Sequence, residues 1–194
     1  HIRLDLPDGV QPIGADKYPF FCDLLKSAQF MEAPRAILKG DPYPVKALLI
    51  VGASVLTSLP GPEMWKECFK KLDFMVVYDR FMTADAMFAD IVLPATTNYE
   101  NLAYQRYPGG YCQLRRRVIE PIAEAKSGYL FLTELAKKLG YGDLFPSTEE
   151  DRLRFAFDSG PISLEELKAH PEGVRYDAGS QEYRKYAKGL LRKD

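Results

Sequence analysis

The chain has 194 residues, of which 46% are hydrophobic and 27% are charged, as in an ordinary folded globular protein. This composition excludes a disordered tail, a fibrous repeat and a small disulfide scaffold. Lys and Arg together number 26 against 27 Asp and Glu, so the formal net charge is -1. Such a balance provides no positive field for a phosphate backbone or an anionic membrane, and we expect no nucleic-acid partner.

The cysteines and apolar runs exclude further classes. Cys22, Cys68 and Cys112 lie more than 40 residues apart and form no C-x-x-C pair, so we expect reduced, structural thiols. Apolar runs such as residues 47–51 are far shorter than the roughly 20 residues that cross a bilayer. We therefore expect no direct membrane insertion. The sequence opens with His1 in place of Met, from which we expect a fragment of a longer protein.

The first half of the chain changes character near residue 46. Residues 1–45 contain six prolines, which favour an irregular segment, and only residues 20–29 have a helical pattern. The apolar run 47–51 is typical of a strand covered on both faces of a parallel sheet. Pro62 begins a segment with helical spacing of apolar residues, and residues 74–78 form a second apolar run. This order predicts a strand, a helix and a strand.

The remaining elements follow in the second half. Residues 84–88 suggest a helical turn and residues 91–93 a third strand, ended by Pro94. Further segments are expected as a loop at 104–111, a weakly alternating stretch at 111–120, a helix at 128–139, helices capped by Ser147 with Glu150 and by Ser163 with Glu166, and a polar tail at 179–194. We therefore predict an α/β fold: a Rossmann-like parallel sheet flanked by helices, with an irregular N-terminal segment and a helical C-terminal extension.

Two loops at the carboxyl ends of the predicted strands are candidate ligand sites, because parallel sheets bind ligands there. Gly52 and Ser54 follow the first strand, where small residues admit a ligand and the serine hydroxyl donates a hydrogen bond. Asp79 follows the second strand, and its carboxylate suits a ribose hydroxyl or the N1 and N2 edge of guanine. The alternative for Asp79 is a helix N-cap. The loop at Gly52 and Ser54 has no G-x-G-x-x-G pattern, so it is weak evidence for a dinucleotide-binding site.

The other polar candidates point to structural roles. His1 and His170 have no neighbouring Cys or His with the spacing of a metal site. The basic run Arg115, Arg116 and Arg117 fits a solvated edge better than a phosphate clasp, because adjacent strand residues face opposite ways. We find no catalytic set of nucleophile and base, so the sequence predicts a chain that holds a ligand without transforming it.

A longer motif resembles a known family. Residues 74–94 read FMVVYDRFMTADAMFADIVLP, with Glu100 after them. They resemble the molybdopterin oxidoreductases of the dimethyl sulfoxide reductase family, in which a strand ending in Asp precedes Phe-x-Thr-Glu-Thr-Ala, Ala-Asp-x-x-Leu-Pro and a later Glu. The likeness also includes residues 40–47 and 124–127. It covers residues 38–140 well. Within the family, the sequence most resembles the branch of the polysulfide and thiosulfate reductases and anaerobic dehydrogenases.

The resemblance implies a fragment of a much larger catalytic subunit of anaerobic respiration, resembling its third domain. Two α/β domains of such enzymes each hold one guanosine arm of a bis(molybdopterin guanine dinucleotide) cofactor. Molybdenum or tungsten, which mediates two-electron transfer, and the iron–sulfur cluster are held outside this region, so we expect the fragment alone to be inactive. The implied segments are a lead-in at 1–45, a guanosine-binding domain at 46–145, and a helical extension at 146–194 toward a missing C-terminal domain.

Partners are implied in the same way. They are the rest of the parent polypeptide, an iron–sulfur electron-transfer subunit and a membrane-anchor subunit, in a prokaryotic cytoplasm or periplasm.

The family's binding residues transfer position by position. Asp79 matches the strand-end Asp that receives guanine or ribose, Tyr78 precedes it at a nucleotide-contacting position, and Thr83 matches the first Thr of the Thr-Glu-Thr motif. Asn101 occupies a further cofactor-contacting position. Together with Gly52 and Ser54, these form the predicted cofactor-binding set, with no catalytic or metal-binding residue.

Three departures from the family pattern favour an alternative. Residues 53–55 replace Gly-x-Asn-Pro, residues 84–85 replace Glu-Thr, and Gly128 stands where Asp commonly follows Lys-Ser. The same domain occurs in respiratory-complex subunits that have lost the pterin, so a cofactor-free scaffold is the alternative function. An apolar side chain filling the crevice at Ser54 would favour that scaffold. A third interpretation, an independent nucleotide-binding module, requires native chain ends.

Overall fold

The computed structural model describes residues 9–25, 27–177 and 179. The chain divides into two compact units, His1–Ala95 and Thr96–Asp194, and each is described by itself. The three segments expected at 1–45, 46–145 and 146–194 stay a prediction. The tail at 179–194, apart from Gly179, lies outside the described residues.

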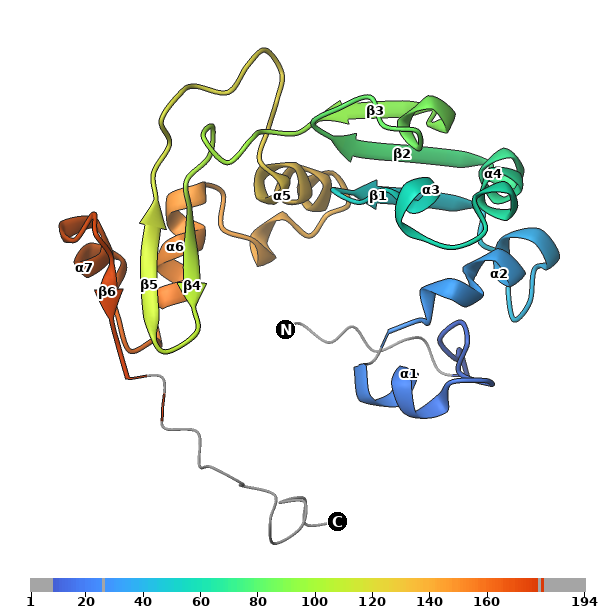
Figure 1. Ribbon diagram of the computed structural model, residues 1–194, viewed down its shortest axis with the longest axis horizontal. Helices are drawn as coiled ribbons and strands as arrows, with labels where there is room; N and C mark the ends of the chain where they lie inside the picture. Colours follow the sequence, from blue (N-terminus) through green and yellow to red (C-terminus); the bar gives the residue numbers. More distant parts are fainter. Residues whose placement is uncertain (1–8, 26, 178, 180–194) are drawn as a thin grey trace, which may run out of the picture. The chain divides into compact units, whose positions relative to one another are not determined.

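The first unit contains a parallel sheet (Figure 1). Its strands are β1 (Ala47–Val51), β2 (Phe74–Asp79) and β3 (Ile91–Pro94), in the spatial order β1-β2-β3. The pairing runs from Ala47 opposite Phe74 to Val51 opposite Tyr78, and Asp79 is opposite Pro94. The predicted α/β fold, a parallel sheet with helices, is confirmed. The sheet's central strand is therefore β2, and Asp79 lies at its carboxyl end.

Short helices accompany this sheet. They are α1 (Pro19–Leu25), η1 (Phe30–Glu32), α2 (Ala33–Lys39), α3 (Val55–Ser58), α4 (Pro62–Lys71) and η2 (Ala86–Phe88). The periodic apolar residues of α4 form its buried side, with Trp65 and Cys68 fully buried and Phe69 4% exposed. They share one core with Ile50 of β1 and residues of β2. Pro62 lies in the first turn of α4, where no amide hydrogen bond is lost.

The prediction that β1 is covered on both faces is wrong for this unit. Ile50 is buried in the core, but Leu49 and Val51 are 39% and 40% exposed. Successive strand residues point to opposite faces. The helices in the core of this unit pack on the face of β1 that carries Leu48 and Ile50. An apolar run shows that a strand is buried on at least one side, and the core of the first unit uses only one side of β1.

The lead-in contains more helix than the prolines predicted. Helix α2 is absent from the sequence-based prediction, because proline usually interrupts a helix. Pro34 stands in the first turn of α2, where proline is tolerated, and Gly40 ends the helix in a left-handed conformation with φ 71°. The expected helix at 20–29 is shorter, since α1 ends at Leu25.

The second unit is built on an antiparallel sheet. Its strands are β4 (Ala103–Tyr107), β5 (Tyr111–Arg115) and β6 (Val174–Arg175), and its helices are α5 (Gly128–Lys138), η3 (Gly142–Leu144), α6 (Glu149–Phe157) and α7 (Leu164–Ala169). The expected loop at 104–111 is a hairpin, a second correction. Gly109 and Gly110, both with positive φ, provide the tight turn that lets this polar, tyrosine-rich segment pair with β5.

Helix caps in this unit agree with the sequence in one case of two. Ser163 caps α7 by accepting the amide of Glu166. The cap of α6 is Thr148 rather than the predicted Ser147, and it accepts the amide of Asp151 at 3.0 Å. Two adjacent hydroxyl residues offer the same chemistry, so spacing alone did not separate them. The helices and strands enclose a core that includes Cys112, Leu153 and Leu167.

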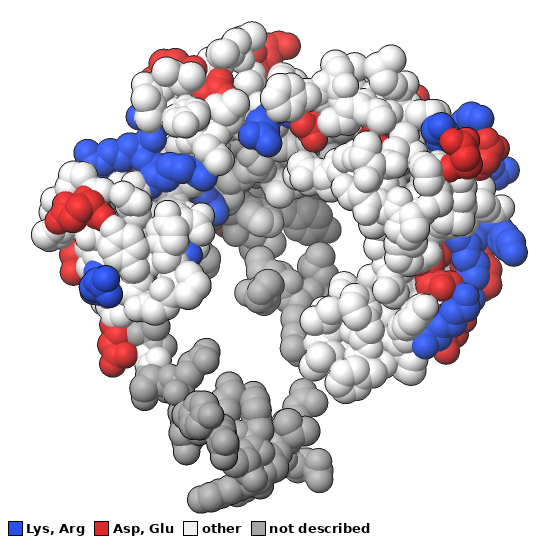
Figure 2. Space-filling model, in the orientation of Figure 1, with Lys and Arg blue, Asp and Glu red and all other residues white. Residues whose placement is uncertain are grey.

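The surface carries mixed charge. On the right of Figure 2, basic and acidic side chains of the first unit lie next to each other, and α4 shows the pattern with the pairs Lys66–Glu63 and Lys70–Glu67. Among the described residues, no helix has the length and apolar character needed to span a bilayer.

Candidate functional site

The candidate site of the first unit is built at the carboxyl end of β2. Val51 of β1 pairs with Tyr78 of β2. Gly52 and Asp79, which directly follow these two residues in the sequence, therefore lie at the same edge of the sheet. The Gly52 amide donates to the Tyr78 carbonyl at 3.0 Å, and the Ala95 amide donates to the Asp79 carbonyl at 3.1 Å. The strands on either side therefore fix the backbone of Asp79.

The carboxylate of Asp79 is only half used by the protein. Its Oδ1 accepts the amide of Phe81 at 3.1 Å, which closes a local turn. Within the described part of the chain, Oδ2 has no hydrogen-bond partner, and the side chain is partly exposed. Asp79 is not the cap of a helix, since the next helical element, η2, begins at Ala86. One carboxylate oxygen thus stays open to a donor from outside.

The loop after β1 leaves space and an unused hydroxyl. Gly52 has φ 59°, and a Cβ at that position would meet nothing within 4 Å. Ser54 precedes α3, but its side chain makes no capping bond. Its Oγ is buried and finds no partner among the residues described. A buried hydroxyl without a partner is costly in a folded protein, so this atom suits an external hydrogen-bonding group.

Asp85 is a polar residue of this edge that the sequence analysis treated only as a departure from a motif. It is 0% exposed. Its Oδ2 accepts the amide of Val55 at 2.5 Å and its Oδ1 accepts the amide of Leu56 at 2.9 Å. The loop after β2 is thereby joined to the start of α3. The only sequence signal was an acidic residue between the apolar segments of this unit.

Two other predicted residues of the first unit lie nearby in the chain but are occupied by the fold. Thr83 accepts the amide of Ala86 through Oγ1 at 3.2 Å and so starts η2. Tyr78 is 6% exposed. The structure therefore leaves space at Gly52 and an open carboxylate oxygen of Asp79 at the sheet edge, and a buried hydroxyl without a described partner at Ser54. The side chains of Thr83 and Tyr78 are engaged or covered.

Asn101, the last predicted residue, belongs to the second unit. Its Nδ2 donates to Thr96 Oγ1 and to the Thr97 carbonyl, each at 3.1 Å, and its Oδ1 accepts Arg115 at 3.0 Å. Both amide protons are used within the unit. The Asn101 side chain thus holds its own loop in place.

Glu100 beside it is a second engaged acid, 3% exposed. It accepts the amides of Thr97 at 2.6 Å and Ile122 at 2.9 Å. Hydrogen bonds from Thr97 and Ile122 lower the pKa of the Glu100 carboxyl below its ordinary value of 4.5, against the opposing effect of burial. This carboxylate ties two loops together and has a structural role.

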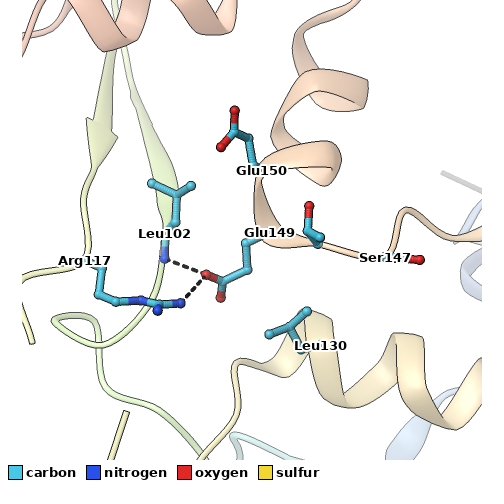
Figure 3. A pocket seen from close by; sticks show the side chains of 7 residues that line it. Leu102, Arg117, Leu130, Ser147, Glu149 and Glu150 are labelled. Carbon is cyan, nitrogen blue, oxygen red and sulfur yellow. Dashed lines mark hydrogen bonds and ion pairs between the residues drawn. The ribbon is translucent and has the colours of Figure 1, made fainter. Parts of the chain in front are cut away.

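A pocket of about 580 Å³ lies in the second unit. Leu102 and Leu130 form apolar walls, and Figure 3 shows Glu149 directed at Arg117 and the backbone of Leu102. Glu149 accepts the Leu102 amide at 3.1 Å and pairs with Arg117 at 3.2 Å. Its charge is thus balanced within the pocket, which contains none of the predicted site residues.

The donor set of the first unit fits a nucleoside better than a metal. A carboxylate oxygen, a buried hydroxyl and an open glycine match the hydroxyl and amino groups of a nucleoside and the room it needs. In the described residues, no group of three or more His, Cys, Asp or Glu side chains is arranged to hold a metal ion.

Comparisons with known proteins agree on one family. The chain is 38% identical over 101 residues to the F420-dependent formate dehydrogenase subunit alpha of Methanocaldococcus jannaschii, covering 52% of this chain and 15% of that protein. It is 30% identical over 160 residues to the acetylene hydratase of Syntrophotalea acetylenica, covering 79% of this chain and 20% of that protein. The chain spans about a fifth or less of the length of such relatives.

A solved structure and a family model complete the comparison. The acetylene hydratase structure from Pelobacter acetylenicus superposes with a TM-score of 0.67 at 26% identity, covering 77% of this chain and 21% of that one. The sequence model of the molybdopterin oxidoreductases matches residues 29–138, more than half of the chain. The chain belongs to the molybdopterin oxidoreductase family.

Proposed function

We propose that this chain anchors one guanosine arm of a bis(molybdopterin guanine dinucleotide) cofactor within a larger molybdenum or tungsten oxidoreductase. The observation that carries the proposal is the half-used carboxylate of Asp79, at the carboxyl end of the central strand beside the open Gly52. Ligands of parallel sheets bind at this end. Membership of the molybdopterin oxidoreductase family supplies the class of ligand.

Three residues would hold the guanosine. Asp79 Oδ2 accepts from the ribose hydroxyls or from N1 and N2 of guanine, and a carboxylate acceptor makes these bonds stronger than a neutral one. The hydroxyl of Ser54 gains the partner it lacks. Gly52 leaves room for the ligand to approach the backbone.

The contribution of the chain to the reaction is placement. When bound, the cofactor supplies a metal centre for two-electron transfer, which is chemistry that the side chains of a protein do not provide. The residues of this chain fix the distal end of the cofactor, and fixing one end restricts the orientation of the other. The metal ligand, the iron–sulfur cluster, an electron-transfer subunit and a membrane-anchor subunit belong to the proposal as parts outside residues 1–194.

A cofactor-free scaffold is the second candidate, and a specific observation favours it. Asn101 and Thr83 use their polar groups within the protein, and Tyr78 is covered. Half of the predicted binding set therefore has a structural role already. The two candidates differ in one property, which is whether Asp79 and Ser54 bind a nucleotide.

An amide-shift titration of the 194-residue chain with GMP and GDP separates them. We expect shifts at Gly52, Ser54 and Asp79, at millimolar concentrations, because half of a two-domain clamp binds weakly. Asp79→Asn keeps the shape of the side chain, removes its charge and should abolish the shifts.

The matched control is Asp73→Asn, which makes the same chemical change just before the amino end of β2, where Asp73 is exposed and pairs with Lys46 at 3.6 Å. This control should titrate like the wild type. Absence of any shift at the edge of the sheet, or equal shifts in Asp79→Asn, would favour the scaffold.

A further inference from the structure

The carboxylate of Asp85 accepts hydrogen bonds from two backbone amides, at a place where parallel-sheet proteins commonly bind an anion. The amides of Val55 and Leu56 follow the loop after β1, and they donate to the two carboxylate oxygens of Asp85 at 2.5 and 2.9 Å. Amides at the carboxyl edge of a parallel sheet, before a helical turn, are frequent binding groups for phosphate. In this chain an internal carboxylate takes that place, and both donors are used.

The charge of Asp85 has no basic partner in the part of the chain that the structure describes. The side chain is 0% exposed, and only backbone amides contact its carboxylate oxygens. A second anion brought close to a buried carboxylate is repelled, since the low local dielectric screens the two charges poorly. A phosphate group is therefore disfavoured at these amides both by the lack of free donors and by charge.

The open groups near this loop select for hydrogen-bond donors. Asp79, at the end of the strand that pairs with β1, adds a second carboxylate whose Oδ2 has no partner among the described residues. The adjacent basic residue, Arg80, lies over the ring of Phe81, 5.8 Å from its centroid. The groups around this edge are therefore the open carboxylate oxygen of Asp79, the buried carboxylate of Asp85 and the buried hydroxyl of Ser54. Hydroxyl and amino groups of a nucleoside fit this surface, whereas its phosphate groups do not.

We propose that Asp85 is a positioning and specificity-determining residue that fills the anion position at the Val55 and Leu56 amides, so that the site takes the uncharged nucleoside part of its ligand and excludes phosphate. The inference rests on the proposed function, since it concerns the same site. It also specifies the orientation of the bound ligand. The base and ribose lie against the sheet edge, and the pyrophosphate points away from α3.

The test compares guanosine, GMP and inorganic phosphate by amide-shift titration of the 194-residue chain. In the wild type, guanosine and GMP should bind with dissociation constants within about threefold of each other, because the phosphate gains no contact at the site. Inorganic phosphate should leave the Val55 and Leu56 amides unshifted. Asp85→Asn removes the charge, and the preference for GMP over guanosine should rise by about fivefold or more.

Asp90→Asn is the matched control. Asp90 also accepts a backbone amide, that of Met75 at 2.7 Å, but at the amino end of β2, so its neutralisation should leave the GMP-to-guanosine ratio unchanged. If Asp85→Asn does not fold, the wild-type comparison of guanosine with GMP and the wild-type phosphate titration still decide the inference.

The outcomes keep the two proposals apart. Binding of GMP at least about tenfold tighter than guanosine in the wild type, with the largest shifts at Val55 and Leu56, would overturn the role of Asp85 and leave the nucleotide site intact. If neither guanosine nor GMP binds, the proposed function fails. The phosphate titration then tests the role of Asp85 by itself. Shifts at Val55 and Leu56 in the wild type overturn the inference. Shifts that arise only in Asp85→Asn support it.

Discussion

The two units differ in whether the fold uses all of the acidic side chains compared between them. In the second unit, Glu100 accepts two backbone amides, and Glu149 accepts the Leu102 amide and pairs with Arg117. In the first unit, Asp85 is engaged in the same manner, but Asp79 leaves one oxygen open. The buried hydroxyl of Ser54 also has no partner among the described residues. An acid that follows a strand is therefore a ligand candidate only when the fold leaves part of it unused.

This difference follows from the geometry of the two sheets. The parallel strands of the first unit end together at one edge, so their loops face a common space that ligands can enter. The hairpin of β4 and β5 instead closes on itself, with Ala103 opposite Arg115 and Tyr107 opposite Tyr111. The loops that flank it are held by side-chain bonds such as those of Glu100. The first unit leaves polar groups unused at its sheet edge, whereas the second uses its acids to hold its own loops together.

The largest expected effect on stability is that of Asp85→Ala. It leaves the buried amides of Val55 and Leu56 without an acceptor, so the first unit should lose about 3–5 kcal/mol of unfolding free energy. Trp65, the only tryptophan of the chain, is fully buried in this unit, so urea unfolding followed by its fluorescence measures the loss. Asp73→Ala should change the same value by less than about 0.5 kcal/mol. Equal values for the two variants would show that Asp85 does not hold the loop.

Glu149→Ala should have a smaller effect, in the second unit. The Leu102 amide and Arg117 lose their shared acceptor, and we expect a loss of about 1–3 kcal/mol. Amide hydrogen exchange at Leu102 and along β5 reports this unit separately. Glu120→Ala, which removes an exposed partner of the same Arg117, should leave the exchange rates nearly unchanged. Unaltered exchange in Glu149→Ala would contradict the engaged role of this acid.

The stabilising contribution of Glu100 should depend on pH. Its folded pKa is lowered first by a hydrogen bond with the Thr97 side chain and then by the amides of Thr97 and Ile122. Its contribution is therefore complete above the ordinary value of 4.5 and is lost as the pH falls through the lowered folded value. The amide shifts of Thr97 and Ile122 should titrate with a midpoint below 4.5.

Comparison with two variants tests this pH dependence. The stability of Glu100→Gln should vary less than that of the wild type as the pH falls through this range. Glu124→Gln, at an exposed acid, should behave like the wild type. A midpoint at or above 4.5 would refute the assignment.

Asp79→Asn should have the smallest effect on stability, within about 0.5 kcal/mol of the wild type. Its carboxylate makes one hydrogen bond, which an asparagine Oδ1 also accepts. Trp65 fluorescence under urea measures this as well. A loss comparable to that of Asp85→Ala would place Asp79 among the structural acids and remove the contrast within the first unit.

Much of the fold was predictable from local patterns. The apolar runs at β1 and β2 and the helical spacing in α4 specify their elements without tertiary information. Helix α2 was missed because Pro34 lies in its first turn, and β4 because its residues are polar and its turn is rich in glycine. In both cases, a residue that usually interrupts structure sits where the structure accepts it.

The site was predictable only in part, since sequence identifies polar residues at strand ends but not which of their atoms stay free. Gly52, Ser54 and Asp79 follow from the ends of the strands, and their role in binding stays a prediction. The side chain of Asn101 is instead used by Thr96 in the preceding loop and by Arg115 at the end of β5, a pairing that the sequence does not reveal. Asp85 could not be found, because its bonds to Val55 and Leu56 join residues about 30 positions apart.

The central claim is that the open acid of the first unit binds a nucleotide and that the engaged acids do not. The most direct test is urea unfolding, followed by Trp65 fluorescence, with and without GMP. At about ten times its dissociation constant, GMP should stabilise the wild type and Glu149→Gln by about 1.4 kcal/mol and should not stabilise Asp79→Asn. Equal stabilisation of wild type and Asp79→Asn, or none in either, would contradict the account.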